Sequence, residues 1–130
     1  MESQSSDSQE IISHLLSQAI RSCNLIINWN RNINSANEYL YSDENIEKMA
    51  ATCMMIETIG EILKKIDRIN DKFLIEKDSS LPWKQIKGLR DKIAHGYYNL
   101  DEEIIFDIVS NEVQKWKDSF ERIKLSISTN

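Results

Sequence analysis

Glycine, proline and cysteine are scarce in this chain of 130 residues, which holds 3, 1 and 2 of them respectively. So few glycines and prolines cannot supply the turns of a many-stranded sheet, and the composition therefore favours helices. The two cysteines, Cys23 and Cys53, lie in apolar helical patterns and form no metal-type spacing with histidine. We expect both to be buried, reduced thiols, and we expect no metal and no cofactor.

Long apolar runs are also missing. No stretch approaches the roughly 18 consecutive apolar residues that a membrane-spanning helix needs. The first nine residues contain neither a basic start nor an apolar segment, so they do not resemble a signal peptide. We expect residues 1–9 to be a disordered polar tail and the protein to be cytoplasmic.

An overall basic charge is absent as well, because 21 acidic residues outnumber 16 basic ones and the formal net charge is −5. This balance argues against broad, non-specific binding of nucleic acid. Basic residues nevertheless cluster between positions 84 and 92, where only Asp91 is acidic. We expect phosphate to be attracted to this segment through Lys84, Lys87, Arg90 and Lys92.

Apolar residues recur at spacings of three and four along most of the chain, which predicts helices over residues 10–30, 43–69, 82–95 and 101–125. Residues 70–80 read as a connector that Phe73, Leu74 and Ile75 attach to the core. Short links between four main helices predict an all-α, antiparallel bundle of four to five helices. We expect one domain over residues 10–125 and a C-terminal tail over 126–130.

The helix expected over residues 43–69 has two apolar faces, which is typical of a central helix. Ser42 or Asp43 would cap its start. Gly60 lies in its middle at a cost of about 1 kcal/mol relative to alanine, so we expect another backbone to approach closely there. Glu61 is either a solvated residue paired with a lysine one turn away or a residue beside a cleft.

Arg90 and His95 are the candidate catalytic residues. Arginine has the geometry to bind phosphate with two parallel hydrogen bonds, and histidine exchanges a proton near neutral pH. Together they suffice to bind or cleave a phosphodiester without a metal. The alternative is structural, with a salt-bridged surface arginine and a histidine that stabilises a helix C-terminus.

Helical spacing limits what these residues achieve within one chain. Side chains five residues apart on a helix point about 140° away from each other, so Arg90 and His95 would not share a face. Asp91 and His95, four residues apart, would share one, so that Asp91 would orient the imidazole. Two copies packed about a two-fold axis would bring both pairs into one cleft.

The motif and its flanks point to a family. Arg90, His95 and Tyr97 have the spacing R-x4-H-x-Y, which resembles the signature of the HepT-like branch of the HEPN superfamily. The segment 82–89, the Ile59-Gly60-Glu61 triplet and the residues after Asp101 are similar to that family's flanking segments. The likeness covers roughly residues 8–125.

The resemblance implies a metal-independent endoribonuclease that acts as a homodimer. His95 would take the proton of a ribose 2′-hydroxyl, Arg90 would stabilise the charge on phosphorus, and a 2′,3′-cyclic phosphate would form. It further implies the toxin of a type VII-like HepT/MntA toxin–antitoxin pair. In such a pair, an MntA-type nucleotidyltransferase antitoxin would transfer AMP to Tyr97 and inactivate the enzyme. The alternative is a non-catalytic helical module that binds nucleotide or RNA, or docks the nucleotidyltransferase.

Overall fold

The computed structural model describes residues 2–94 and 99–128. Helices make up most of this part of the chain, and one isolated antiparallel bridge joins Ala94 to Leu100. In chain order the elements are α1 (Glu2–Trp29), the 3-10 helix η1 (Ala36–Leu40), α2 (Asp43–Ile69), α3 (Phe73–Lys77), α4 (Trp83–Lys87), α5 (Leu89–Ile93), α6 (Glu102–Asn111) and α7 (Val113–Ser128).

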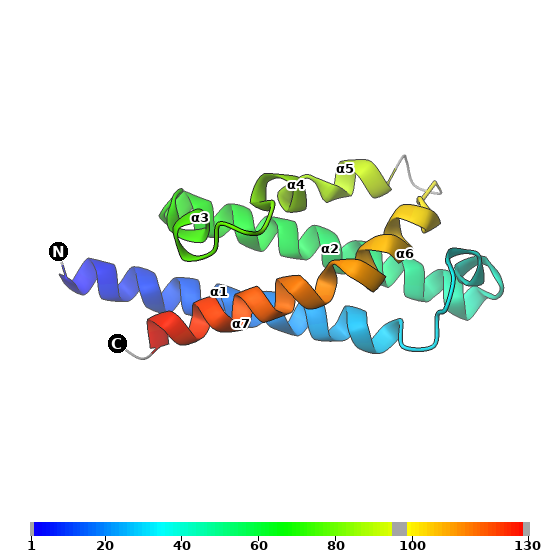
Figure 1. Ribbon diagram of the computed structural model, residues 1–130, viewed down its shortest axis with the longest axis horizontal. Helices are drawn as coiled ribbons and strands as arrows, with labels where there is room; N and C mark the ends of the chain where they lie inside the picture. The colour runs from blue at the N-terminus through cyan, green and yellow to red at the C-terminus, as the bar shows by residue number, and fades with distance from the viewer. Residues whose placement is uncertain (1, 95–98, 129–130) are drawn as a thin grey trace.

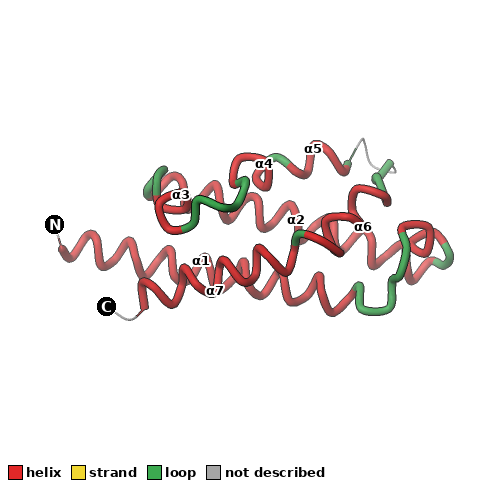
Figure 2. Tube along the Cα trace, viewed as in Figure 1, coloured by secondary structure: helices red, strands yellow, loops and turns green. Residues whose placement is uncertain are grey.

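Three long helices, α1, α2 and α7, lie along the length of the molecule, and α1 packs against both of the others (Figure 1). The short helices α4 and α5 follow one another along α2, which they both contact. Helix α6 crosses to η1 and α2 near the end of the bundle opposite the chain termini (Figure 2). The expected all-α bundle is therefore confirmed. Among the described residues, no helix combines the length and apolar character that crossing a bilayer requires.

One continuous core joins these helices. Its largest fully buried side chains come from every long helix and from η1, α5 and α6, as expected from the apolar stripes in the sequence. They are Trp116, Tyr39, Phe120, Leu16, Ile26, Ile56, Ile59, Leu63, Ile66, Ile93, Ile105 and Val113. Cys23 and Cys53 are buried free thiols, as predicted. Burial raises the pKa of the Cys23 thiol to about 12.

Helix α2 has the predicted bounds, and Ser42 caps it by accepting a hydrogen bond from the Asn45 backbone N–H at 3.1 Å. Helix α1 differs from the prediction because it begins at Glu2. Residues 2–9 therefore extend this helix where we expected a polar tail. In the connector, Phe73 and Leu74 are buried as predicted, but Ile75 is 53% exposed and does not attach the segment to the core.

The helix predicted over residues 82–95 is wrong in two respects. It is divided at Gly88, where a tight turn brings the Gly88 N–H to the Gln85 carbonyl at 3.1 Å. It then ends at Ile93, because Ala94 is extended (φ −119°, ψ 112°) and pairs with Leu100. Glycine is the residue that most weakens a helix after proline, which accounts for the division.

The last predicted helix is also two helices, with the break at Glu112. Asp101 caps the first of them, as predicted, and accepts a hydrogen bond from the Ile104 N–H at 3.0 Å. The buried positions explain the break: they are three or four residues apart on either side, but five separate Ile108 from Val113. A five-residue step does not keep both side chains on one face of a straight helix.

A buried polar network holds the asparagine-rich end of α1. The Asn30 amide donates to the Ile26 carbonyl and to Thr52 Oγ1, each at 2.8 Å, and its oxygen accepts the Tyr39 hydroxyl at 2.6 Å. Thr52 in turn donates to the Lys48 carbonyl at 2.7 Å. Burial raises the pKa of Tyr39 to about 12. The network therefore joins α1, η1 and α2 with satisfied hydrogen bonds.

The loop before α4 is anchored by Asp78. Its carboxylate accepts hydrogen bonds from Ser119 Oγ at 2.6 Å and from the Ser80 N–H at 2.9 Å, and it pairs with Arg122 at 3.2 Å. The Asp78 carbonyl accepts the Trp83 indole N–H at 2.7 Å. One aspartate therefore attaches the start of α4 to α7.

Candidate functional site

The candidate site lies where α4 and α5 run antiparallel to α2. Gly60 is the point of closest approach, because a Cβ atom there would lie 3.3 Å from the Lys87 carbonyl oxygen. The close approach predicted from the sequence is thus confirmed. Glu57 lies three residues before Gly60 in α2, and Arg90 lies three residues after Lys87. The side chains of Glu57 and Arg90 contact each other.

The Arg90 guanidinium pairs with Glu57 through Nε, which lies 3.3 Å from Glu57 Oε1. Both side chains face solvent, with 60% of Arg90 and 44% of Glu57 exposed. Glu57 was not among the site residues predicted from the sequence. The signal was available, because Glu57 lies one helical turn before Gly60, the residue expected to meet another backbone.

A small pocket of about 120 Å³ lies beside this pair. Its lining comes from α2 and from the α4–α5 segment, and it includes four of the predicted site residues, Glu61, Lys87, Arg90 and Asp91. Cys53 lies one turn before Glu57 on α2. Burial raises the pKa of the Cys53 thiol, the Glu57 charge adds to this effect and the Arg90 charge opposes it.

The basic segment is less positive in the fold than in the sequence. Lys87 forms an ion pair with Asp67 of α2, and both side chains are largely buried. Arg90 has Glu57 as its partner. Two of the four cations expected to attract phosphate are thus paired with acids of α2, which offsets the local positive charge.

Lys84 and Lys92 lie on different sides of the α4–α5 segment. Lys84 lines a groove with Lys64 and Lys87, two residues that also line the Arg90 pocket. Lys92 instead lines a groove toward α6 and α7 with Asp107. Residues two positions apart on a helix face opposite ways, so the structure separates Lys92 from Arg90.

Both interpretations of Glu61 find support in the structure. Glu61 is exposed and pairs with Lys64 at 3.2 Å, as a solvated helix residue would. It also lines the pocket that contains Arg90. Its predicted supporting role therefore stays a prediction.

His95 and Tyr97 lie outside the described residues. The end of α5 at Ile93 nevertheless corrects the argument made for them from helical spacing. The 140° separation of Arg90 and His95 and the shared face of Asp91 and His95 both assumed a helix through residue 95. Asp91 is exposed and, within the described residues, forms no ion pair. Its orienting role remains a prediction without that geometric support.

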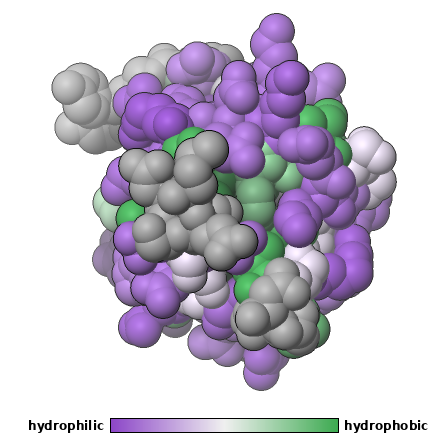
Figure 3. Space-filling model, turned by 90° about the vertical axis from the view of Figure 1, so that its left-hand side faces the viewer, coloured by the Kyte–Doolittle hydropathy of each residue, from purple (hydrophilic) through white to green (hydrophobic). Residues whose placement is uncertain are grey.

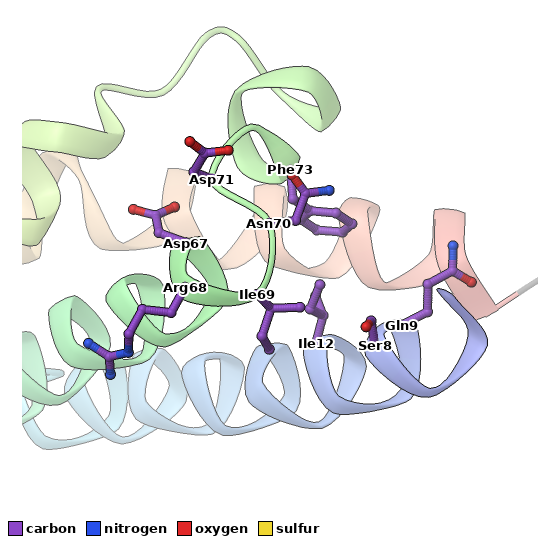
Figure 4. A pocket seen from close by; sticks show the side chains of 9 residues that line it. All are labelled: Ser8, Gln9, Ile12, Asp67, Arg68, Ile69, Asn70, Asp71 and Phe73. Atoms are coloured by element: carbon purple, nitrogen blue, oxygen red, sulfur yellow. The ribbon is translucent and has the colours of Figure 1, made fainter. Parts of the chain in front are cut away.

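A larger groove of about 620 Å³ lies at the end of the bundle that holds the chain termini. Figure 3 looks onto this end, where hydrophilic side chains surround a smaller apolar area. In Figure 4 the side chains of Ile12 and Ile69 point toward each other on the floor, and Asp67 and Asp71 lie above them. Asp67 is already paired with Lys87, and none of the motif residues that the structure describes lines this groove. We therefore assign it no chemistry.

Within the described part of the chain, no group of His, Cys, Asp and Glu side chains is arranged to hold a metal ion.

Comparison with known proteins shows the family to which the chain belongs. The sequence profile of a family described as "Ribonuclease HepT-like" matches residues 31–123. The Methanocaldococcus jannaschii protein named "Putative RNase MJ1216" is 32% identical over 98 residues, which cover 75% of this chain and 74% of that protein. A second protein of that organism, "Putative RNase MJ1380", is 30% identical over 114 residues, covering 88% of this chain and 97% of its own length.

A more distant relative from Thermococcus cleftensis, "Probable ribonuclease HepT", is 28% identical over 74 residues, covering 57% of this chain and 64% of that protein. Alignments with three further relatives span 48% to 60% of their lengths. No solved structure matches the chain. The profile match contains the α2–α5 contact and the whole R-x4-H-x-Y motif, and the chain belongs to the HepT-like ribonuclease family of the HEPN superfamily.

Proposed function

We propose that the protein is a metal-independent endoribonuclease. His95 takes the proton of a ribose 2′-hydroxyl, the 2′ oxygen bonds to the adjacent phosphorus, and the bond from phosphorus to the 5′ oxygen breaks. The departing 5′ oxygen takes up a proton, and the other product ends in a 2′,3′-cyclic phosphate. Arg90 stabilises the negative charge that develops on the phosphate oxygens. Single-stranded or loop RNA is the expected substrate, because its 2′-hydroxyl can rotate into line.

The match of residues 31–123 to the HepT-like ribonuclease family is the observation that carries this proposal. The placement of Arg90 supports it. Its Nε contacts Glu57, and 60% of the side chain is exposed, so the end of the guanidinium is accessible to a phosphate.

We propose that two copies of the chain complete the active site. The pocket beside Arg90 measures about 120 Å³. Sites for small ligands usually span about 300–1,000 Å³, so this pocket is too small to enclose a nucleotide. A two-fold homodimer with the α4–α5 segments facing each other would supply Arg90 and His95 from both chains. Cross-linking and light scattering would measure whether the active species is a dimer.

The ribonuclease assay uses a single-stranded RNA of mixed sequence in buffer with EDTA. Wild-type protein is expected to cleave it and to leave 2′,3′-cyclic phosphate ends. His95→Ala is expected to abolish cleavage. The matched control is His14→Ala, which removes the other histidine of the chain, an exposed residue of α1 whose ring contacts Gln18 at 3.4 Å. Unchanged cleavage by His95→Ala would refute the mechanism.

We further propose that this ribonuclease is the toxin of a type VII-like HepT/MntA pair in the cytoplasm. The MntA-type nucleotidyltransferase would transfer AMP from ATP to the Tyr97 hydroxyl and release pyrophosphate. A bulky anion two residues from His95 would repel RNA from the site. Incubation with ATP, Mg²⁺ and the transferase should add the mass of AMP to the wild type and to Tyr98→Phe. It should add nothing to Tyr97→Phe, and modification of that variant would contradict the assignment.

A second candidate function is a non-catalytic module that binds nucleotide or RNA, or docks the nucleotidyltransferase. The observation that favours it is the charge balance, since Lys87 and Arg90 are both paired with acids and the net charge is −5. It predicts RNA or partner binding with no cleavage product. Binding titrations run beside the cleavage assay distinguish the two functions.

A further inference from the structure

Glu57 is a carboxylate of α2 for which neither the motif nor the comparisons supply a role. We propose that it is a positioning residue, which holds Arg90 through an ion pair at Nε and leaves the end of the guanidinium free for phosphate. This inference rests on the proposed ribonuclease function, because it specifies how one residue of that site is oriented.

The two partners are attached to the fold very differently. Glu57 lies in the 27-residue helix α2, next to Ile56 and one turn before Gly60, both of which are buried. Arg90 lies in the five-residue helix α5, whose buried residue is Ile93. The long helix therefore carries the carboxylate and the short helix carries the guanidinium. Because Glu57 is held in the long helix α2, its contact with Arg90 of the short helix α5 restricts the arginine side chain, which otherwise has many rotamers.

Gly60 sets the distance across which this contact is made. Its missing side chain lets the Lys87 carbonyl come within 3.3 Å of where a Cβ would lie, so α2 and α4 approach each other more closely than a larger residue would readily allow. The antiparallel course then brings Arg90 opposite Glu57. The Lys87–Asp67 ion pair joins the same two segments farther along α2 and fixes them in a second place.

The hydrogen-bond inventory of arginine shows why the contact at Nε matters. The guanidinium has five N–H donors in one plane. The Glu57 carboxylate lies on the Nε side of the guanidinium, 3.3 Å from that atom, so the four N–H groups of Nη1 and Nη2 remain to bind two phosphate oxygens. A carboxylate at Nη would have competed directly with the substrate.

The exposure of the pair separates this role from a structural one. Exposed salt bridges contribute little to stability, and this pair is about half exposed. Removing the Glu57 carboxylate should therefore leave the fold intact. Loss of orientation at a reacting centre, in contrast, costs up to about a hundredfold in rate. The carboxylate also lies close to where phosphate binds, so its removal should not weaken binding of RNA.

The experiment compares Glu57→Ala, Glu57→Gln and the control Glu44→Ala by kcat, KM and thermal unfolding, with the single-stranded RNA in EDTA. Glu44 is a matched control because it is an exposed carboxylate of the same helix, 3.8 Å from Lys48. We expect Glu57→Ala to lower kcat at least about tenfold with KM unchanged or lower. Glu57→Gln keeps the shape of the side chain but removes the charge of the ion pair, so it should lower kcat about as much as Glu57→Ala.

Three results would overturn the inference: kcat of Glu57→Ala equal to that of Glu44→Ala, a loss seen only in KM, or wild-type kcat in Glu57→Gln. If Glu57→Ala is unfolded at the assay temperature, Glu57→Asp takes its place, because it withdraws the acceptor by one methylene and keeps the charge. It should lower kcat, and wild-type kcat in that variant would refute the role. A wild-type protein that cleaves no RNA would instead refute the proposed function itself.

Discussion

Replacing Asp78 by asparagine should destabilise the protein at neutral pH, and this destabilisation should disappear in acid. The hydrogen bonds from Ser119 and Ser80 and the charge of Arg122 hold the pKa of the Asp78 carboxyl at about 2, below its ordinary 3.8. Its side chain is only 12% exposed, so solvent screens these contacts little. The difference between the two pKa values corresponds to about 2 kcal/mol of folding free energy, since each pKa unit is worth about 1.4 kcal/mol.

The direction of this pH dependence follows from whether the folded or the unfolded state binds the Asp78 proton more weakly. Because the folded pKa of Asp78 is the lower one, the carboxylate stabilises the fold above pH 3.8, and this contribution is lost as the pH falls toward 2. It should be about half its neutral value near pH 3. The assay is urea unfolding of wild type and Asp78→Asn at a series of pH values from 7 to 2.

The control for that series is Asp118→Asn, an exposed residue of α7 that accepts a hydrogen bond from Gln114 at 3.0 Å. The difference in unfolding free energy between Asp118→Asn and wild type should change little with pH. A stability difference for Asp78→Asn that stays constant from pH 7 to 2 would refute the reasoning, because it would show that the charge of Asp78 contributes nothing. The Asp78 carbonyl also accepts a hydrogen bond from Trp83 at the start of α4, so we expect the substitution to affect the candidate site as well.

Three further predictions concern other parts of the molecule. Asn30→Ala should lower the free energy of unfolding by about 2–3 kcal/mol, because it leaves the buried Tyr39 hydroxyl without its acceptor. Urea unfolding measures the loss, and a loss under about 0.5 kcal/mol would contradict the prediction. Gly60→Val should cost about 1–3 kcal/mol and lower RNA cleavage, because its side chain would meet the Lys87 backbone; a fully active, equally stable variant would contradict the close approach. Lys84→Ala should weaken RNA binding and reduce the slope of log affinity against log salt by about one; an unchanged slope would remove Lys84 from the RNA-binding surface.

Much of the fold could be predicted from the sequence because apolar periodicity is a local signal. Helix α2 is the clearest case, since its bounds, its Ser42 cap and the close approach at Gly60 all follow from residues within the helix or directly before it. The breaks at Gly88 and Glu112 were missed for a different reason. Each depends on where the chain must turn to keep its apolar side chains on the core, which a pattern within one helix reveals only weakly.

The candidate site was predictable only in part. The sequence identified Arg90 and the α4–α5 segment, because the motif is contiguous. It did not identify Glu57 or Asp67, since the ion pairs they form join residues far apart in the chain. For the same reason the segment 84–92 looked more basic in the sequence than it is in the fold, where acids of α2 neutralise two of its cations.

The most direct test of the account is RNA cleavage in the presence of EDTA by wild type, His95→Ala and His14→Ala. The account predicts cleavage with 2′,3′-cyclic phosphate ends by the wild type and by His14→Ala, and none by His95→Ala. Equal cleavage by all three proteins, or cleavage that EDTA abolishes, would contradict it.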